Sequence, residues 1–238
     1  MIGKEVARTP RAALIAVVLL FLIGCQARKA DSSQAQTPLA EKERDALEPD
    51  RPVSFGYKCA WLAIRSDDPQ AVVAALGLTH VRKSGWDRGI DAAYKRELFV
   101  TPPIKGWVLA VHSELISKVH ESRRDRLSPL MTALSKQFPD VQYFGTYRVE
   151  EYHGWARAVN GEIVRQYAYW GSEGETIFDI GKPTREEERL GLVFNGDTTF
   201  PDEKDVMKIA GAWSIDPTTL HQIEAEKGIG YLGLYPEN

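Results

Sequence analysis

Residues 150–153, Glu-Glu-Tyr-His, carry the side chains best suited to acid–base chemistry. Two carboxylates can serve as general acid and general base when their surroundings separate their pKa values. Glu150 and Glu151 are adjacent, so on a strand their side chains would point to opposite faces. They could act together only with a third group from elsewhere in the chain. We therefore expect a solvated turn at this point, before a hairpin.

The next segment predicts that hairpin and a candidate binding surface. Asn160-Gly161 separates two strand-like runs and favours a tight turn, because both turn residues take positive φ. With Val159 opposite Glu162, the register advances by twos. One face would then collect His153, Trp155, Arg157, Gln166 and Trp170. Tryptophan and arginine often anchor binding interfaces, so this face is either a protein or glycan contact or an amphipathic sheet face covered by a loop.

Other chemistry finds little support in the residue spacing. The five histidines, which are His80, His112, His120, His153 and His221, include no pair at a metal-binding spacing such as HExxH or HxH. Residues 171–181, GSEGETIFDIG, lack the Lys-Ser/Thr of a phosphate-binding loop, and GxSxG is absent from the sequence. We expect no metal, no cofactor and no catalytic residue.

The two cysteines, Cys25 and Cys59, differ in their surroundings. Cys59 begins the apolar run Cys-Ala-Trp-Leu-Ala-Ile and has no neighbouring base that would activate a thiolate. We expect a buried free thiol that packs as a small hydrophobic side chain.

The first 25 residues read as a targeting segment. Lys4, Arg8 and Arg11 precede an uninterrupted apolar run from Ala12 to Ile23, and Gly24-Cys25 follows it. A basic start, a short apolar core and a small residue at the cleavage point are typical of a secretory signal peptide. The run is short for a membrane span, which needs about 20 apolar residues.

Leu22-Ile23-Gly24-Cys25 resembles the lipobox of bacterial lipoproteins. The resemblance implies cleavage before Cys25, attachment of lipid such as palmitate to Cys25, and a mature chain that starts there. Gln26 is not the aspartate that favours inner-membrane retention, so the resemblance implies the outer membrane, facing the periplasm. An uncleaved anchor helix, or a plain signal peptide with an incidental cysteine, is the alternative.

Charge and composition restrict the partners of the mature chain. Residues 1–24 hold three of the 30 basic and one of the 33 acidic residues, which leaves 27 basic and 32 acidic residues and a net charge of −5. This balance argues against nucleic acid, whose phosphates require concentrated positive charge. Residues 25–52 are rich in Gln, Ser, Ala, Pro and charge, so we expect a lipidated cysteine followed by a disordered tether.

Residues 53–238 predict one globular domain. Hydrophobic patterning places strands at 57–64, 79–83, 97–100, 107–112, 141–149, 155–159, 162–170 and 176–180. Helices are expected at 70–76, 128–137, 183–187, 202–213 and 216–220. Asp68 is the expected cap of the first of them, and Thr184 and Glu187 stand at capping-box spacing. Residues 84–96 read as a hairpin connection or irregular strand, and residues 228–238 as an edge strand or a loop. Hairpins dominate this order, so we expect an α+β fold with antiparallel sheet and flanking helices.

The body itself gives one weaker resemblance. Residues 102–112 and 154–187 resemble a bacterial group of uncharacterised function, and this likeness implies no site residue. We therefore expect an envelope lipoprotein that acts as a non-catalytic protein-binding module, for example an immunity or inhibitor protein against a periplasmic effector. A hydrolase acting on cell wall or glycan, and a structural envelope-assembly lipoprotein, are the alternatives.

Overall fold

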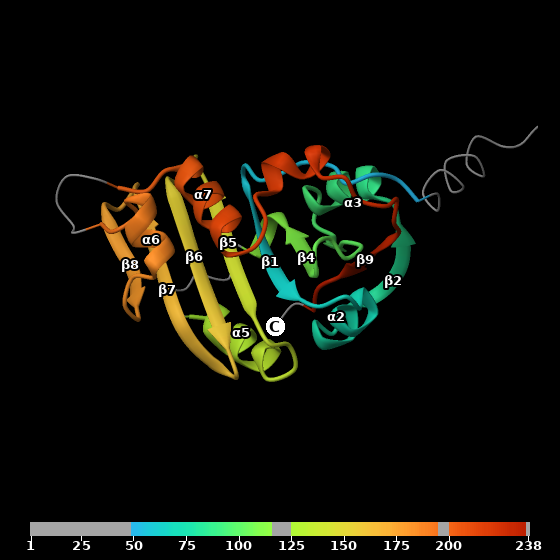
Figure 1. Cartoon of the computed structure of the whole chain (residues 1–238), viewed down its shortest axis with the longest axis horizontal. Coiled ribbons are helices and arrows are strands. Elements are labelled where there is room, and N and C mark those ends of the chain that lie inside the picture. Colours follow the sequence, from blue (N-terminus) through green and yellow to red (C-terminus); the bar gives the residue numbers. More distant parts are fainter. Residues whose placement is uncertain (1–48, 116–124, 195–199, 237–238) are drawn as a thin grey trace, which may run out of the picture. The chain divides into compact units, whose positions relative to one another are not determined.

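A nine-stranded antiparallel sheet forms the centre of the domain in the computed structural model, which describes residues 49–115, 125–194 and 200–236. The predicted signal peptide, Cys25 and nearly all of the predicted tether lie outside these residues. The strand order is β2-β9-β3-β4-β1-β5-β6-β7-β8 (Figure 1). The strands are β1 (Cys59–Arg65), β2 (Thr79–Ser84), β3 (Leu98–Val100), β4 (Trp107–His112), β5 (Val141–Tyr147), β6 (Tyr152–Val159), β7 (Glu162–Trp170), β8 (Glu175–Ile180) and β9 (Gly230–Leu234). The predicted antiparallel sheet with flanking helices is confirmed.

Helices cover both faces of this sheet, because alternate residues of its central strands are apolar on each side. Along β1, Trp61 and Ala63 belong to one core, and Leu62 and Ile64 belong to the other. The first core lies under α3 (Trp86–Ala93), α7 (Glu203–Trp213) and the 3₁₀ helix η2 (Pro217–Gln222), with α6 (Arg185–Leu190) beside α7. The second core lies under α2 (Pro69–Ala75) and α5 (Leu127–Ser135). A short 3₁₀ turn, η1 (Ser113–Leu115), follows β4.

Helix α3 occupies the segment for which we expected an irregular connection, so that expectation was wrong. Trp86, Gly89, Ile90 and Ala93 recur at helical spacing and are buried. Gly89 permits close packing, since a Cβ atom there would lie 2.3 Å from the Phe99 ring. Gly85, Gly89 and the short apolar side chains of this segment made the helix difficult to predict from the sequence pattern.

Asp50 caps α3 from a distant part of the chain. Its carboxylate accepts hydrogen bonds from the backbone N–H groups of Trp86 and Asp87, the latter at 3.0 Å. Its own backbone bridges to Gly228. The side chain that caps the N-terminus of α3 therefore comes from outside the local sequence of the helix.

Strand β9 lies inside the sheet, where we expected an edge strand or a loop. It pairs with β2 on one side and β3 on the other. Leu232 is fully buried opposite Phe99. The true edges of the sheet are β2 and β8.

The β6–β7 hairpin forms at Asn160-Gly161 as predicted, with φ of 53° and 81° at the two turn residues. The register does not advance evenly, because it shifts between Arg157 and Ala158. Arg157 pairs with Arg165, whereas Ala158 pairs with Ile163, so Val164 is the extra residue. Every residue of β7 beyond Val164 consequently lies on the face opposite to the one we expected.

Candidate functional site

A cleft of the described domain opens where the β5–β6 turn meets the start of α7. Its volume is about 540 Å³, within the range of small-ligand sites. Residues from four separate segments line it: Tyr57, Arg148, Glu151, His153, Tyr169, Phe200, Pro201, Asp202, Glu203 and Lys204. The lining combines three aromatic rings, two cations, three carboxylates and one imidazole.

His153 provides the fixed polar group of this cleft. It is 5% exposed, and its Nδ1 lies 3.0 Å from the Oγ1 of Thr146, the residue opposite it on β5. Thr146 is fully buried, so this hydrogen bond satisfies its hydroxyl group and holds the imidazole ring in place.

The charge of His153 follows from its surroundings. Burial lowers the pKa of His153, and the carboxylates of Asp202 and Asp205 oppose that shift by attracting a proton. The net pKa is lower than usual, so the imidazole is neutral at neutral pH. A neutral ring can donate a hydrogen bond to a ligand and does not repel a cation.

Two stacked aromatic rings form one wall of the cleft. The centroids of Tyr169 and Phe200 lie 4.6 Å apart, with 17° between the ring planes. Phe200 is 47% exposed, as is Tyr57 elsewhere in the lining. Exposed aromatic side chains beside polar ones are a common feature of recognition sites.

The three carboxylates of the cleft are not equivalent. Asp202 caps α7 by accepting hydrogen bonds from the backbone N–H groups of Lys204 and Asp205. Glu151 belongs to the exposed β5–β6 turn and takes a left-handed backbone conformation, with φ of 53°. Glu203 is half-buried, and its Oε1 atom is shielded from solvent without a hydrogen-bond partner among the described residues. The turn predicted at Glu150-Glu151 is confirmed.

The five predicted binding residues do not share one surface, so that part of the prediction was wrong. His153, Trp155 and Arg157 lie on the face covered by α7, whereas the register shift places Gln166 and Trp170 on the opposite face. Trp155, Gln166 and Trp170 are buried. His153 is the one member of the set that lines the cleft.

The other predicted residues make structural contacts. Trp155 donates from Nε1 to Glu187, and Gln166 accepts from the Ser128 hydroxyl at 2.8 Å. Arg157 donates from Nε and one terminal nitrogen to Asp140, with its guanidinium 6.0 Å from the Trp213 ring centroid. Each of these contacts joins the sheet to a neighbouring element.

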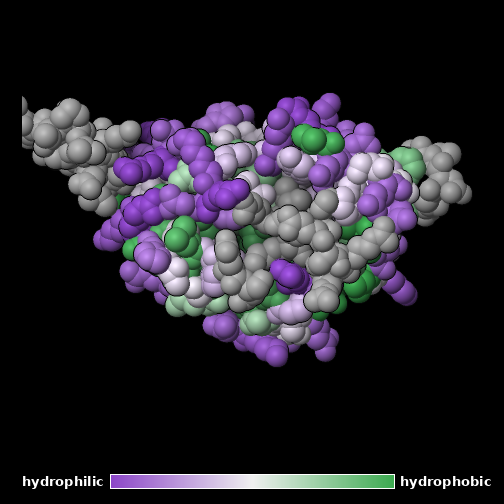
Figure 2. All heavy atoms as spheres, turned by 180° about the vertical axis from the view of Figure 1, so that it is seen from behind, coloured by the Kyte–Doolittle hydropathy of each residue, from purple (hydrophilic) through white to green (hydrophobic). Residues whose placement is uncertain are grey.

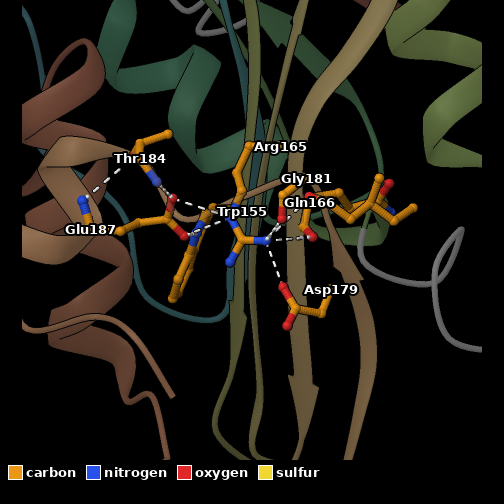
Figure 3. Close-up of polar contacts among 8 residues, drawn as sticks. Trp155, Arg165, Gln166, Asp179, Gly181, Thr184 and Glu187 are labelled. Atoms are coloured by element: carbon orange, nitrogen blue, oxygen red, sulfur yellow. Dashed lines mark hydrogen bonds and ion pairs between the residues drawn. The ribbon is translucent and has the colours of Figure 1, made fainter. Parts of the chain in front are cut away.

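A buried ion-pair cluster lies close to Trp155, and the sequence analysis did not anticipate it (Figure 3). Arg165 on β7 bonds to the carboxylate of Glu187 on α6 at 2.8 Å, and to Asp179 on β8 at 2.6 Å. Glu187 also accepts from the backbone N–H of Thr184 in the capping box that was predicted at these two residues. The cluster holds α6 against the sheet, and its central pair, Arg165 and Glu187, is closed to solvent.

Cys59 is buried and free, as predicted. Burial raises its pKa to about 12, although the Tyr94 hydroxyl, 3.6 Å from the sulfur, lowers it slightly. A thiol with this pKa is not a nucleophile at neutral pH.

The described residues hold no group of three or more His, Cys, Asp or Glu side chains suited to a metal ion. They also include no helix that is both long and apolar enough to cross a membrane.

Comparisons with known proteins identify no relative of this chain. No family model matches the chain, and neither the curated proteins nor the solved structures contain a significant match.

Cleft residues that sequence reasoning missed come from distant segments. Phe200 and Glu203 follow His153 by about fifty residues, which is about a quarter of the domain 53–238. Thr146, which contacts His153 but does not belong to the lining, lies seven residues before it. The strand pairing of β5 with β6 would have suggested Thr146. No local signal marks the aromatic and acidic residues at the start of α7 as part of a site.

Proposed function

We propose that this protein is a lipid-anchored envelope protein that binds a protein partner through the cleft beside His153. The observation that carries the proposal is the lining of that cleft, where a fixed imidazole, exposed aromatic rings and charged side chains meet. Binding hot spots combine aromatic residues with a few well-placed polar groups in this way.

The lining supports a binding role. The cleft residues that the structure describes include no serine, threonine or cysteine that could act as a nucleophile beside His153. Asp202 is engaged at the helix cap, and Cys59 is buried as a neutral thiol. A hydrolase, the alternative function, would have to depend on the carboxylates of Glu151 and Glu203 in the same lining.

Location and charge define the kind of partner. Anchoring at Cys25 through lipid would hold the domain at the membrane, and the residues before Pro49 would act as a tether. The predicted mature chain is acidic, so it attracts basic partners. An immunity or inhibitor protein that meets a basic effector in the periplasm is the specific form of this proposal.

The anchor can be tested separately from the cleft. Cells grown with an alkyne-labelled fatty acid should produce a labelled, membrane-bound protein, and Cys25→Ala should abolish both the label and the membrane fractionation. An unlabelled wild-type protein would contradict lipid attachment. Outer-membrane location is tested by density-gradient separation of the two membranes.

Site-specific photocrosslinking tests the binding function in intact cells. A photoreactive phenylalanine analogue at Tyr57, which is 47% exposed in the cleft, should crosslink one protein of defined mass. The same analogue at Val164, which is 45% exposed on β7 outside the cleft lining, serves as the matched control. Equal crosslinking at both positions would contradict the proposal, as would cleavage of purified peptidoglycan by the full-length protein.

A further inference from the structure

We infer that His153 makes the cleft sensitive to acid: protonation of its ring loosens the start of α7 and weakens binding of the protein partner. The inference rests on the proposed binding function and adds the condition under which the cleft binds. It depends on the position of His153 under α7, on the way in which the start of α7 is attached to the domain, and on the charged groups around the ring.

The start of α7 forms half of the cleft as one short segment. Five of the ten lining residues are consecutive, from Phe200 to Lys204. Among the described residues, the hydrogen bonds of this segment stay within α7 and its capping box, where Asp202 accepts from the backbone N–H groups of Lys204 and Asp205. The segment meets the sheet through packing, as in the stack of Phe200 on Tyr169. It can therefore move outward without breaking a hydrogen bond to the sheet.

His153 lies on the face of the sheet that α7 covers, and it is 5% exposed. Its cross-strand neighbours are Thr146 on β5 and Tyr169 on β7. The hydrogen bond to Thr146, at 3.0 Å, fixes the ring in this row. A proton taken up by the ring is consequently placed where little water reaches it, and such a charge is costly unless another group compensates it.

The charged groups around His153 already serve other contacts or stand in solvent. They are Arg148 and Glu151 of the β5–β6 turn, and Asp202, Glu203, Lys204 and Asp205 at the start of α7, while β7 contributes the uncharged Tyr169. Asp202 and Asp205 attract a proton to the ring, but both belong to the capping box of α7. The helix N-terminus carries a partial positive charge, which disfavours a cation. Burial outweighs the attraction, so the pKa of His153 is lowered.

A lowered pKa in the closed cleft means that acid favours any arrangement in which the ring is solvated. Outward movement of the start of α7 would solvate the ring and free the two capping carboxylates to face its charge. A partner seated in the cleft has the opposite effect, because it removes water that remains around the ring. Uptake of a proton and binding of the partner therefore oppose each other.

Hydrogen exchange of the full-length lipid-free chain, Cys25→Ala, tests the effect on α7. After correction for the intrinsic exchange rate, the protection of residues 202–207 should fall about two- to tenfold between pH 7.5 and 5.5. About tenfold is the limit for one group whose ordinary pKa is 6.5. His153→Gln, which keeps a hydrogen-bonding side chain but takes up no proton, should remove this dependence.

Helix α2 is the matched control within the same molecule. Its N-cap is also an aspartate, Asp68, and the helix packs on the opposite face of the sheet. Figure 2 shows that side of the domain, where hydrophilic residues occupy much of the surface. The protection of residues 69–75 should stay constant over the same pH range. If protonation of capping aspartates caused the loss in α7, α2 would lose protection in parallel.

Photocrosslinking from the analogue at Tyr57 tests the effect on the partner. In cells suspended at pH 5.5, the yield of the crosslinked partner should be at least about twofold lower than at pH 7.5. His153→Gln should give the same yield at both pH values. His80→Asn, which removes an exposed histidine from β2 outside the cleft lining, should retain the wild-type dependence. Thermal melts at both pH values establish that each variant is folded.

The inference fails if α7 and α2 lose protection equally, or if His153→Gln keeps the acid dependence of the wild type. The comparison of α7 with α2 in the wild type remains decisive if His153→Gln does not fold. A crosslinked partner whose yield does not change with pH would leave the binding function intact and remove the acid sensitivity. Absence of a crosslink at either pH would instead remove the binding function, while the exchange data would still decide whether protonation loosens α7.

Discussion

Arg165 and Glu187 lie side by side in the interior, with the guanidinium Nε 2.8 Å from one carboxylate oxygen and 3.1 Å from the other. Neither side chain is accessible to a ligand, since their exposures are 3% and 0%. The pair joins β7 to α6, and α6 in turn lies beside α7, which supplies Glu203 to the cleft. Its role is therefore to position elements rather than to perform chemistry.

Glu187→Gln should destabilise the domain strongly. Among the described residues, the substitution leaves the buried Arg165 charge with Asp179 as its only charged partner, beside backbone carbonyl acceptors such as that of Ile180. Breaking such a buried pair typically costs about 3–5 kcal/mol. The free energy of unfolding, measured by urea titration, checks this value. Asp179→Asn is the control, because the Asp179 side chain is 56% exposed and exposed pairs contribute about 0–1 kcal/mol. Similar losses in both variants would contradict the positioning role.

Asp50→Ala should destabilise α3, although Asp50 and α3 lie far apart in sequence. Loss of the cap leaves the N–H groups of Trp86 and Asp87 without their acceptor, at an expected cost of about 0.5–2 kcal/mol. Hydrogen exchange of residues 86–93 should accelerate. Asp67→Ala is the control, because Asp67 is an exposed acid for which no helix-capping contact is observed. In this variant, residues 86–93 should exchange at the wild-type rate. Unchanged protection of α3 in Asp50→Ala would show that the cap contributes nothing.

Acidification should destabilise the folded state through His153. Burial lowers the pKa of this histidine below its ordinary value of 6.5, so the unfolded chain binds the proton more readily. The contribution of neutral His153 to the free energy of unfolding is fully present above pH 6.5. It is lost as the pH falls through the lower pKa that His153 has in the folded state. The melting temperature should therefore drop less between pH 7.5 and 5.5 in His153→Gln than in the wild type. An equal drop in the two proteins would contradict this origin of the acid sensitivity.

Cys59 should resist alkylation in the folded protein. Burial raises its pKa to about 12, so almost no thiolate exists at pH 8, and the sulfur is also inaccessible. In the Cys25→Ala chain, maleimide labelling should be slow in buffer and rapid in 6 M guanidinium, with mass spectrometry as the readout. Because the pKa is raised on folding, the stability from the neutral thiol is complete below pH 9 and is lost between pH 9 and about 12. Rapid labelling of the native chain would contradict the buried position.

Local signals explain why most of the secondary structure could be predicted. Asp68 does cap α2, Asn160-Gly161 does form the hairpin turn, and Thr184 with Glu187 does form a capping box. In each case the residues that determine the structure are neighbours in sequence. Helix α3 escaped prediction because its cap comes from Asp50, and β9 was misplaced because its partners lie more than a hundred residues away.

The cleft was harder to predict than the fold. A single extra residue, Val164, moved Gln166 and Trp170 away from His153, and alternation along a strand cannot reveal such a bulge. The rest of the lining depends on where the start of α7 lies against the ends of β6 and β7. That placement arises from core packing between distant segments, for which the sequence holds no local pattern.

The position of β9 also affects how the domain can mature. Among the described strands, β2 pairs only with β9, and one edge of β3 stays unpaired until residues 230–234 are available. A chain that emerges N-terminus first must therefore keep these edges unpaired while about 130 residues follow β3. Such edges attract chaperones and proteases, and they promote aggregation. A chain that terminates before β9 would keep the edges of β2 and β3 unpaired. Proteases and chaperones could then distinguish it from a complete copy.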